Sequence, residues 1–508
     1  MVCIHLLLCI LFLFTLALPR ESLRVCVPRS RLAKGEEGMG QISGEVEGKR
    51  GGIMQGKMVV ILRTSSVARA SVYRHLREKG IIFVLVHPVR PESAFDGVFH
   101  YHLVHDTNDV DALEPVLRRF LTRHGLSPDA VISFDEYAVY PAAVLAQRMG
   151  FRPIPLPPEK LRRTCIKSLL REDCAGNGIA SLVAGVLTRP PPGEADLLAH
   201  VQRVLGVAGA KFPLVLKPSP GAGSLLAKLC FSVEEVRDHA VEMWDVFASH
   251  SATKHFEAVL DPTVRKEGVE VLFEEYIGGQ EVDLNCCIEN GKVVFCSIDD
   301  NFEVRPPYFV ETGGLCPTAL PPHEQNELRK LLDRYVAFHG KYLHGVLHFE
   351  AKYDFERRQA YVIEVNCRLG SAETDTMIRT CYRGLQLGES LVRCALGLSV
   401  TEQLLSHYPE RLMEVNSGDS YFPVSCYCAS VNIYPCAEGV LVRAEAPTSD
   451  KALVEYSVSA VPGELVAPPP KSFCLLAWMV ARGATAEEAK SAIARLTENF
   501  VQEVSVFH

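Results

Sequence analysis

The sequence has no C-x-x-C pair and no N-x-[ST] glycosylation site, although it contains 17 cysteines in 508 residues. The cysteines are scattered and odd in number, which argues against a zinc ribbon or a disulfide framework and predicts buried, reduced thiols. No block of lysine and arginine occurs, and the formal net charge is -8, so no nucleic-acid-binding surface is expected. These absences favour a cytoplasmic protein without a nucleic-acid partner.

The first 20 residues disagree with that location. They contain an apolar run, VCIHLLLCILFLFTLAL, which has the length of a signal-peptide core and is short of the roughly 20 residues of a spanning helix. No lysine or arginine precedes the run, and Pro19 stands where a cleavage site would end. A signal or membrane anchor and an over-extended start, with folding from Met54 or Met58, remain alternatives. Any membrane association is expected only through residues 1–20.

The rest of the chain divides into a linker and three domains. Residues 21–56, rich in glycine, glutamate and basic residues, are predicted to be a disordered linker. From Lys57, buried apolar strands alternate with helices, which predicts a parallel βαβ domain over residues 57–157, ending at the proline-rich PIPLPP. A second domain is expected over residues 158–400, and a β-rich one over 401–508. The fold class is therefore α/β and α+β.

Single elements follow from the same patterns. Strands are expected at 57–63, 81–88, 130–134, 212–217 and 271–277, and helices at 71–80, 110–124, 138–149, 160–171, 323–339 and 485–499. Asn290-Gly291 predicts a hairpin within 282–298. Residues 374–397 are expected to be mostly helical, and strands dominate from about 401. Thr485 with Glu488 matches the spacing of a capping box.

Two apolar segments, VLHFEAKY and AYVIEVN, each carry a glutamate in the middle. Glu350 and Glu364 are fourteen residues apart, an even number, so a hairpin through DFERRQ would place both on one face. The even positions His348, Glu350, Lys352, Glu364, Asn366 and Arg368 are polar. The odd positions, expected to face the core, are Leu347, Phe349, Ala351, Tyr353, Tyr361, Ile363 and Val365.

An ordinary half-solvated hairpin remains an alternative for this pattern. Directly opposed like charges are unfavourable, however, without a cation between them. The carboxylates of Glu350 and Glu364 and the amide oxygen of Asn366 are hard ligands suited to Mg²⁺, which commonly also binds substrate phosphates. A candidate phosphate site exists in VLKPSPGAGSLLAK, where Lys217 ends an apolar strand and a turn follows with Gly221, Gly223 and Ser224. Taken alone, this turn is a weak signal.

Together these pieces resemble the ATP-grasp superfamily, from about residue 57 to the end. The resemblance implies two α+β lobes that hold ATP behind a βαβ domain, with Mg²⁺, or Mn²⁺, as the metal. It assigns the metal ligands to Glu350, Glu364 and Asn366, and a catalytic role to Arg368 and Lys217. The nucleotide-binding residues that it implies are Lys167 (with Lys160 as the alternative), Lys217, Gly221, Gly223, Ser224, Glu274, the backbone of Glu275 and Ile277, and Glu281 for the ribose.

Within the superfamily, the chain is most similar to amino-acid ligases of the L-amino-acid ligase and carnosine synthase type. The similar segments are DAVISFDEYAVYPAAVLAQRMG, SVNIYPCAEGVL and MVARGATAEEAKSAI, the last two in a C-terminal domain like that of biotin carboxylase. That group usually has E-x-x-H before a proline, whereas FVETGGLCP has Glu311 and, at the histidine position, Gly314. Glu311 and Arg368 are therefore only candidate substrate contacts, and the identity of the substrates does not transfer.

The resemblance implies an ATP-dependent carboxylate–amine ligase, a homodimer, that forms an amide through an acyl phosphate and releases ADP and phosphate. Two alternatives stay open. One is a nucleotide-binding sensor of the same fold without catalysis, which Gly314 favours and the intact metal triplet opposes. The other is a biotin-carboxylase-like component, which would need a separate carrier because the chain has no biotinyl-lysine M-K-M context.

Overall fold

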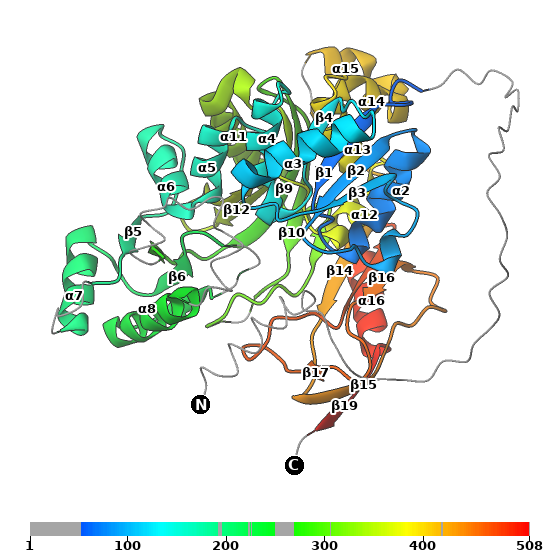
Figure 1. Cartoon of the computed structure of the whole chain (residues 1–508). Helices are drawn as coiled ribbons and strands as arrows, with labels where there is room; N and C mark the ends of the chain where they lie inside the picture. Colours follow the sequence, from blue (N-terminus) through cyan, green and yellow to red (C-terminus); the bar gives the residue numbers. More distant parts are fainter. Residues whose placement is uncertain are drawn as a thin grey trace, which may run out of the picture.

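The structure is a computed structural model that describes residues 52–190, 196–221, 224, 226–248, 269–304, 306–417 and 420–506 (Figure 1). The predicted leader and most of the predicted linker lie outside these residues. The last linker residues belong to the first domain, because Met54 is buried in its core and the Gly56 amide donates to the Gly80 carbonyl. Within the described ranges, no helix is both long and apolar enough to cross a membrane.

The first domain is the parallel βαβ unit that the sequence predicts. Its four strands, all parallel, lie in the order β3-β2-β1-β4. The order reverses between β1 and β4, so the loops that follow these two strands open at the same edge of the sheet, where α/β folds bind ligands. The elements are β1 (Met58–Leu62), α2 (Ala70–Glu78), β2 (Ile82–His87), β3 (Tyr101–Val104), α3 (Val110–Arg123), β4 (Ala130–Ile132) and α4 (Glu136–Arg148).

A small antiparallel sheet forms one lobe of the second domain. Its strand order is β5-β8-β6-β7, and helices α7 and α8 pack against it on the side away from the first domain (Figure 1). The helix expected at 160–171 is two helices, because Ile166 is extended and bridges to Pro220. The elements are α5 (Pro158–Cys165), α6 (Lys167–Gly176), β5 (Ala184–Leu187), α7 (Leu197–Ala208), β6 (Leu214–Pro218), β7 (Lys228–Cys230), α8 (Val233–Ala248) and β8 (Val271–Glu275).

An eight-stranded sheet forms the other lobe and continues into the third domain. Its order is β13-β12-β9-β10-β11-β14-β18-β16, so the pairing of β11 with β14 joins the two domains. The β9–β10 turn has positive φ at Asn290 and Gly291, as the sequence predicts. The strands are β9 (Gln280–Glu289), β10 (Lys292–Asn301), β11 (Gly314–Cys316), β12 (Gly345–Asp354), β13 (Gln359–Asn366), β14 (Tyr427–Ile433), β16 (Leu453–Val458) and β18 (Ala477–Gly483).

Helices cover this sheet, and a three-stranded sheet ends the chain. Strands were expected to dominate from about residue 401, but two helices, α14 and α15, come before the first strand of this part. At the final helix, the Thr485 side chain accepts from the Glu488 amide, as predicted for its cap. The elements are α11 (Pro322–His339), α12 (Ala372–Cys381), α13 (Leu387–Ala395), α14 (Val400–His407), α15 (Leu412–Ser417), β15 (Gly439–Glu445), β17 (Leu465–Val466), α16 (Ala486–Glu498) and β19 (Val501–Val506).

Candidate active site

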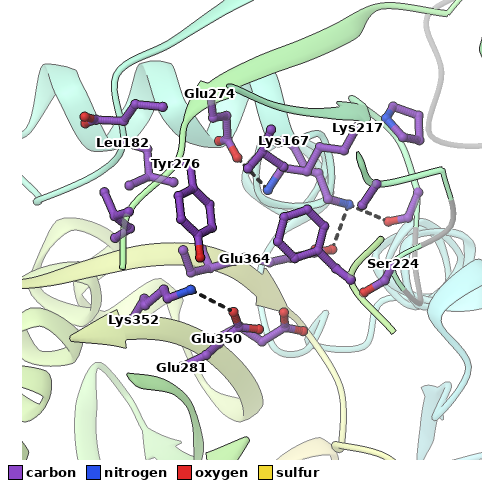
Figure 2. Close-up of a pocket in the computed structure, with 18 residues that line it drawn as sticks. Lys167, Leu182, Lys217, Ser224, Glu274, Tyr276, Glu281, Glu350, Lys352 and Glu364 are labelled. Atoms are coloured by element: carbon purple, nitrogen blue, oxygen red, sulfur yellow. Dashed lines mark hydrogen bonds and ion pairs between the residues drawn. The ribbon is translucent and has the colours of Figure 1, made fainter. Parts of the chain in front are cut away.

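A cleft of about 740 Å³ opens between the small sheet and the β12–β13 end of the large sheet (Figure 2). Most of the residues proposed from the sequence line it: Lys167, Lys217, Gly221, Ser224, Glu274, Glu275, Ile277, Glu281, Glu350 and Glu364. Asn366 and Glu311 are not among the lining residues but contact two that are, Glu350 and Ser224. Arg368 does not line the cleft either, and its side chain contacts Glu136 and the Leu369 carbonyl. Gly223 lies outside the described residues. Lys160 is elsewhere, since its ammonium lies over the rings of Phe338 and Tyr342.

The two central glutamates are direct cross-strand neighbours, as the even spacing predicts. Glu350 on β12 lies opposite Glu364 on β13, and His348 lies opposite Asn366. On its other side, Glu350 lies opposite Asp283 on β9, so three carboxylates stand in a row across three strands. Asp283 was not among the site residues predicted from the sequence. The signal was present, because Glu281, Asp283 and Asn285 alternate with apolar residues.

A β-bulge changes which residues of this hairpin face the core, compared with the prediction from the sequence. The register shifts after Glu350, so that Ala351 pairs with Val362 and Ile363 is left over. Val362 therefore lies in the core, whereas Ile363 faces the cleft and packs with Tyr361 in a separate apolar cluster. The odd positions on β12, together with Val365 on β13, are buried as expected.

The row of carboxylates is electrostatically unfavourable by itself. Burial, and then the charges of Glu364 and Asp283, raise the pKa of Glu350 well above its ordinary value. Burial raises the pKa of Asp283 in the same way. Lys167 offsets part of this charge, with its ammonium 2.8 Å from a Glu364 oxygen. The Asn366 amide nitrogen donates to Glu350 at 2.7 Å, so the amide oxygen is the atom that would reach a cation. This donor set of hard oxygens fits Mg²⁺.

Lys217 is held by a buried ion-pair network. Its ammonium lies 2.7 Å from Glu274, which is 1% exposed and also pairs with Arg171. Burial alone would raise the pKa of Glu274, but Arg171 and Lys217 lower it to about 2. Arg171 in turn donates to the Ile363 carbonyl on β13 at 2.6 Å. Glu274 therefore orients Lys217 at the cleft, a contact that the resemblance in sequence did not predict.

One end of the cleft is apolar. Leu182, Ile277, Tyr361 and Ile363 form the apolar cluster there, with Tyr276 beside it in Figure 2. Next to this cluster the cleft becomes polar. The Lys352 ammonium lies 5.3 Å from the centre of the Tyr276 ring and 3.8 Å from a Glu281 oxygen. Glu275 points away, because its carboxylate pairs with Arg357 at 2.9 Å.

Gly221 and Ser224 of the glycine-rich segment also line the cleft. The Gly221 carbonyl accepts from the Lys167 ammonium at 2.7 Å. Ser224 has a φ of 54° and donates its hydroxyl to Glu311 at 3.5 Å. The Glu311 backbone carbonyl in turn accepts from the Tyr434 hydroxyl at 3.0 Å. The turn is thereby joined to the third domain through Glu311.

The pKa of the Glu311 carboxyl group is raised towards neutral pH. Its side chain reaches solvent at the cleft edge, yet the enclosing protein, and then Glu373 and Glu281, raise its pKa to about 7. Three residues further on, Gly314 lies buried in β11 opposite Asn301. An added Cβ there would come within 2.6 Å of the Asp300 carbonyl oxygen. A histidine side chain therefore does not fit at Gly314 on this backbone.

The first domain contributes directly to the site. Arg368 donates to the Leu369 carbonyl at 2.8 Å, and its guanidinium Nε lies 2.5 Å from Glu136, in the first turn of α4. Arg69, also from the first domain, donates to the Gly370 carbonyl. Burial, followed by the charges of Arg368 and Arg69, lowers the pKa of His348 to about 3, so this imidazole is neutral. Sequence spacing could not reveal the contacts of Glu136 and Arg69, which join residues more than two hundred positions apart.

Comparison with known proteins identifies two domains in the chain. Residues 210–375 match the family of the ATP-grasp domain, and residues 432–505 match the family of the L-amino acid ligase C-terminal domain 2. The chain contains both domains, in the order that the sequence resemblance predicts.

The chain is also similar to individual proteins over more than these two domains. It is homologous to carnosine synthase 1 of Gallus gallus, with 27% identity over 356 residues, which cover 68% of this chain and 36% of that protein. The chain thus spans well under half the length of this curated relative. Among solved structures, it is similar to L-amino acid ligase from Bacillus licheniformis, with a TM-score of 0.70, 16% identity, and coverage of 89% of this chain and 100% of that one.

A further solved structure concerns the architecture. The biotin carboxylase domain of Hydrogenobacter thermophilus 2-oxoglutarate carboxylase matches with a TM-score of 0.59 and 15% identity, covering 88% of this chain and 90% of that one. At sequence identities of 15–16%, the similarity to these solved structures establishes the fold alone. The predicted architecture, a parallel first domain, an ATP-grasp domain and a biotin-carboxylase-like C-terminal part, is confirmed.

Proposed function

We propose that this chain, which contains an ATP-grasp domain, is an ATP-dependent ligase that joins a small-molecule carboxylate to an amine. The observation that carries the proposal is the direct opposition of Glu350 and Glu364 in a cleft that also holds Lys167 and Lys217. Two carboxylates and two ammonium groups in one cleft are the charges that hold a metal–phosphate complex. The relatives named above, an amino-acid ligase and carnosine synthase 1, support the same class.

The cleft supports one orientation of ATP. The apolar cluster around Ile277 suits the adenine ring, and Glu281 beside it suits the ribose hydroxyls. Lys217, fixed by Glu274, and Lys167 then face the phosphates, with Gly221 in the turn that closes over them. Lys167 also pairs with Glu364 at 2.8 Å, so phosphate oxygens of ATP would compete with this carboxylate for the Lys167 ammonium.

Glu350, Glu364 and the Asn366 oxygen would hold Mg²⁺, or Mn²⁺, and Asp283 stands next to them. When bound, the metal would offset the negative charge that develops during phosphoryl transfer. The residues themselves supply the rest: Lys167 and Lys217 stabilise charge on the transferring phosphoryl group. The β12–β13 hairpin keeps the two carboxylates at a fixed spacing because both lie inside a paired strand.

The reaction that we propose has two steps. A substrate carboxylate oxygen attacks the γ-phosphorus of ATP, and the bond between that phosphorus and the β,γ-bridging oxygen breaks. The products of this step are an acyl phosphate and ADP. The amine nitrogen then attacks the acyl carbon and loses a proton as phosphate departs. Arg368 offers a planar fork to the acyl or phosphoryl oxygens, and Glu136 holds that fork. Glu311, with a pKa of about 7, suits the acceptance of the amine proton near neutral pH.

The alternatives have weaker support. A nucleotide sensor without catalysis would not need two opposed carboxylates next to two lysines, and Gly314 is explained by the lack of space in β11. Likeness to a biotin carboxylase domain concerns the fold. The homodimer, the cytoplasmic location and the role of residues 1–20 stay predictions; light scattering on the purified chain tests the first of them.

Phosphate release with paired substrates tests the function. The purified chain is incubated with ATP, Mg²⁺ and pooled amino acids and small acids, and products are identified by mass spectrometry. The proposal expects release of phosphate that needs one acid and one amine together, with a product mass equal to their sum minus water. Glu364→Gln serves as the inactive control and Glu356→Gln, in the exposed β12–β13 turn, as the active one. Tight ATP binding without release across a broad panel would favour the sensor.

A further inference from the structure

Three thiols from distant parts of the sequence meet at one end of helix α12. The sulfur atoms of Cys381, Cys426 and Cys428 all lie within 4.8 Å of one another. Cys381 is the last residue of α12, Cys428 lies in β14, and Cys426 directly precedes that strand. None of the three lines the nucleotide cleft, so the cluster is separate from the proposed active site. The cysteines in the described ranges are all free thiols.

Backbone hydrogen bonds hold the two segments of this cluster together. The Ser425 amide and hydroxyl donate to the Cys381 carbonyl at 2.9 and 3.1 Å. The Cys426 thiol donates to the Thr380 carbonyl at 3.7 Å, and the Cys381 thiol donates to the Cys316 carbonyl at 3.3 Å. The convergence of the sulfurs therefore rests on a helix end and the segment that enters a strand, which are hydrogen-bonded to each other.

We propose that Cys381, Cys426 and Cys428 bind one thiophilic cation, Zn²⁺ or Cu⁺. In a tetrahedral thiolate site with bonds of about 2.3 Å, the sulfurs stand about 3.8 Å apart, so sulfurs within 4.8 Å need to move by about 1 Å or less. Thiolates select these metals over the Mg²⁺ that suits the carboxylates of the cleft. Cys316, whose Cα pairs with that of Cys428, presents its side chain to the same face and is the nearest further thiol for a fourth position.

The burial of the three thiols distinguishes this site from cysteines that pack together only as apolar side chains. Cys381 and Cys428 are fully buried, whereas Cys426 is only half-buried. The cluster thus has a protected interior and one ligand at the surface, which gives a metal a path of entry. Thiols that serve only as small apolar side chains do not need their sulfurs to converge from two elements.

A metal bound at the cluster would stabilise the end of helix α12, because the cluster lies there. Helix α12 starts at Ala372, four residues after Arg368, and ends at Cys381. A cation on the cluster ties the far end of this helix to β14 in the third domain. Its loss would free the end of α12 and loosen the segment that carries Arg368 at the edge of the cleft.

The metal content of the full-length chain tests this site. Protein purified without chelators or a metal-binding tag is assayed by inductively coupled plasma mass spectrometry. About one Zn²⁺ or Cu⁺ per chain is expected, falling below about a tenth in Cys426→Ser, since removal of one of three ligands weakens such a site strongly. The element found distinguishes the two cations. Cys436→Ser, an exposed thiol in the same domain, and Cys230→Ser, a buried thiol in another core, should keep the metal.

Cobalt gives a readout that is independent of catalysis. Metal-stripped wild-type chain titrated with Co²⁺ should develop thiolate-to-cobalt absorption that saturates at about one equivalent and is strongly reduced in Cys426→Ser. Zn²⁺ should also raise the Tm of the stripped wild type but not that of the variant. The proposal is overturned if the wild type gives no thiolate absorption, if Cys426→Ser retains its metal, or if mass spectrometry finds a disulfide among these cysteines.

Discussion

Replacing Glu364 by glutamine should abolish turnover and leave the fold intact. The change removes one of two carboxylates that face each other at the floor of the cleft, in a side chain that is 20% exposed. A unit charge about 4 Å from a cation contributes about 4 kcal/mol at an effective dielectric constant of about 20. That free energy corresponds to a loss of about a thousandfold in rate or metal affinity.

Stability should change little, because two effects of the same substitution oppose each other. Glu364→Gln removes the 2.8 Å pair with Lys167 but also relieves the repulsion that Glu364 exerts on Glu350. Each effect is partly screened by solvent, so the net change in the free energy of unfolding should stay within about 1 kcal/mol. Thermal unfolding of wild type and variant without nucleotide measures it.

The assay pairs turnover with nucleotide binding. Phosphate release reports catalysis, and calorimetric titration with ADP, with and without Mg²⁺, separates the metal contribution from that of the nucleotide. Glu364→Gln should bind metal-free ADP as the wild type does and lose the gain that Mg²⁺ provides. Glu356→Gln removes a charge from the same hairpin without touching the cleft and should behave as the wild type. Unchanged turnover in Glu364→Gln, or a full Mg²⁺ gain, would refute the metal assignment.

Three further results are expected. Lys217→Met should weaken ATP binding about 10- to 100-fold in a titration, because a charge-assisted bond contributes about 1.5–3 kcal/mol, whereas Lys228→Met on the neighbouring strand should not. The raised pKa of Glu350 means that the metal-free folded chain binds more protons than the unfolded chain, so this group destabilises the fold as pH rises from about 4 towards neutrality. In denaturant unfolding without metal, Glu350→Gln should therefore be more stable than the wild type at pH 7 but not at pH 4. An equal difference in the free energy of unfolding at both pH values would count against a raised pKa of Glu350. Gly314→Ala should destabilise the chain by about 1–3 kcal/mol, since its Cβ meets a β10 carbonyl, while Gly206→Ala, in open space on α7, should not lower the Tm.

Much of the candidate site could be predicted because it depends on the alternation of side chains along a strand. The even spacing of Glu350 and Glu364 predicts a shared face, and they are cross-strand neighbours; the turn pairs Asp354 with Gln359, however, so it is the bulge at Ile363 that brings Glu364 opposite Glu350. The same reasoning failed at Tyr361 and Ile363, because a bulge moves one residue out of the ladder and exchanges the faces beyond it. Nothing in the alternation of residue types marks the position of that bulge.

The amino-acid sequence by itself determined the alternating elements of the first domain, the hairpin turn at Asn290 and Gly291, and the polar faces of the strands. Those features arise from contacts within a few residues, where side-chain period and turn chemistry decide. Only the tertiary structure placed Glu136 on Arg368 and brought Cys381 to Cys428. Such pairs are made when separate elements pack, and their geometry is set by the summed burial of whole sheets and helices, which no short stretch of sequence contains.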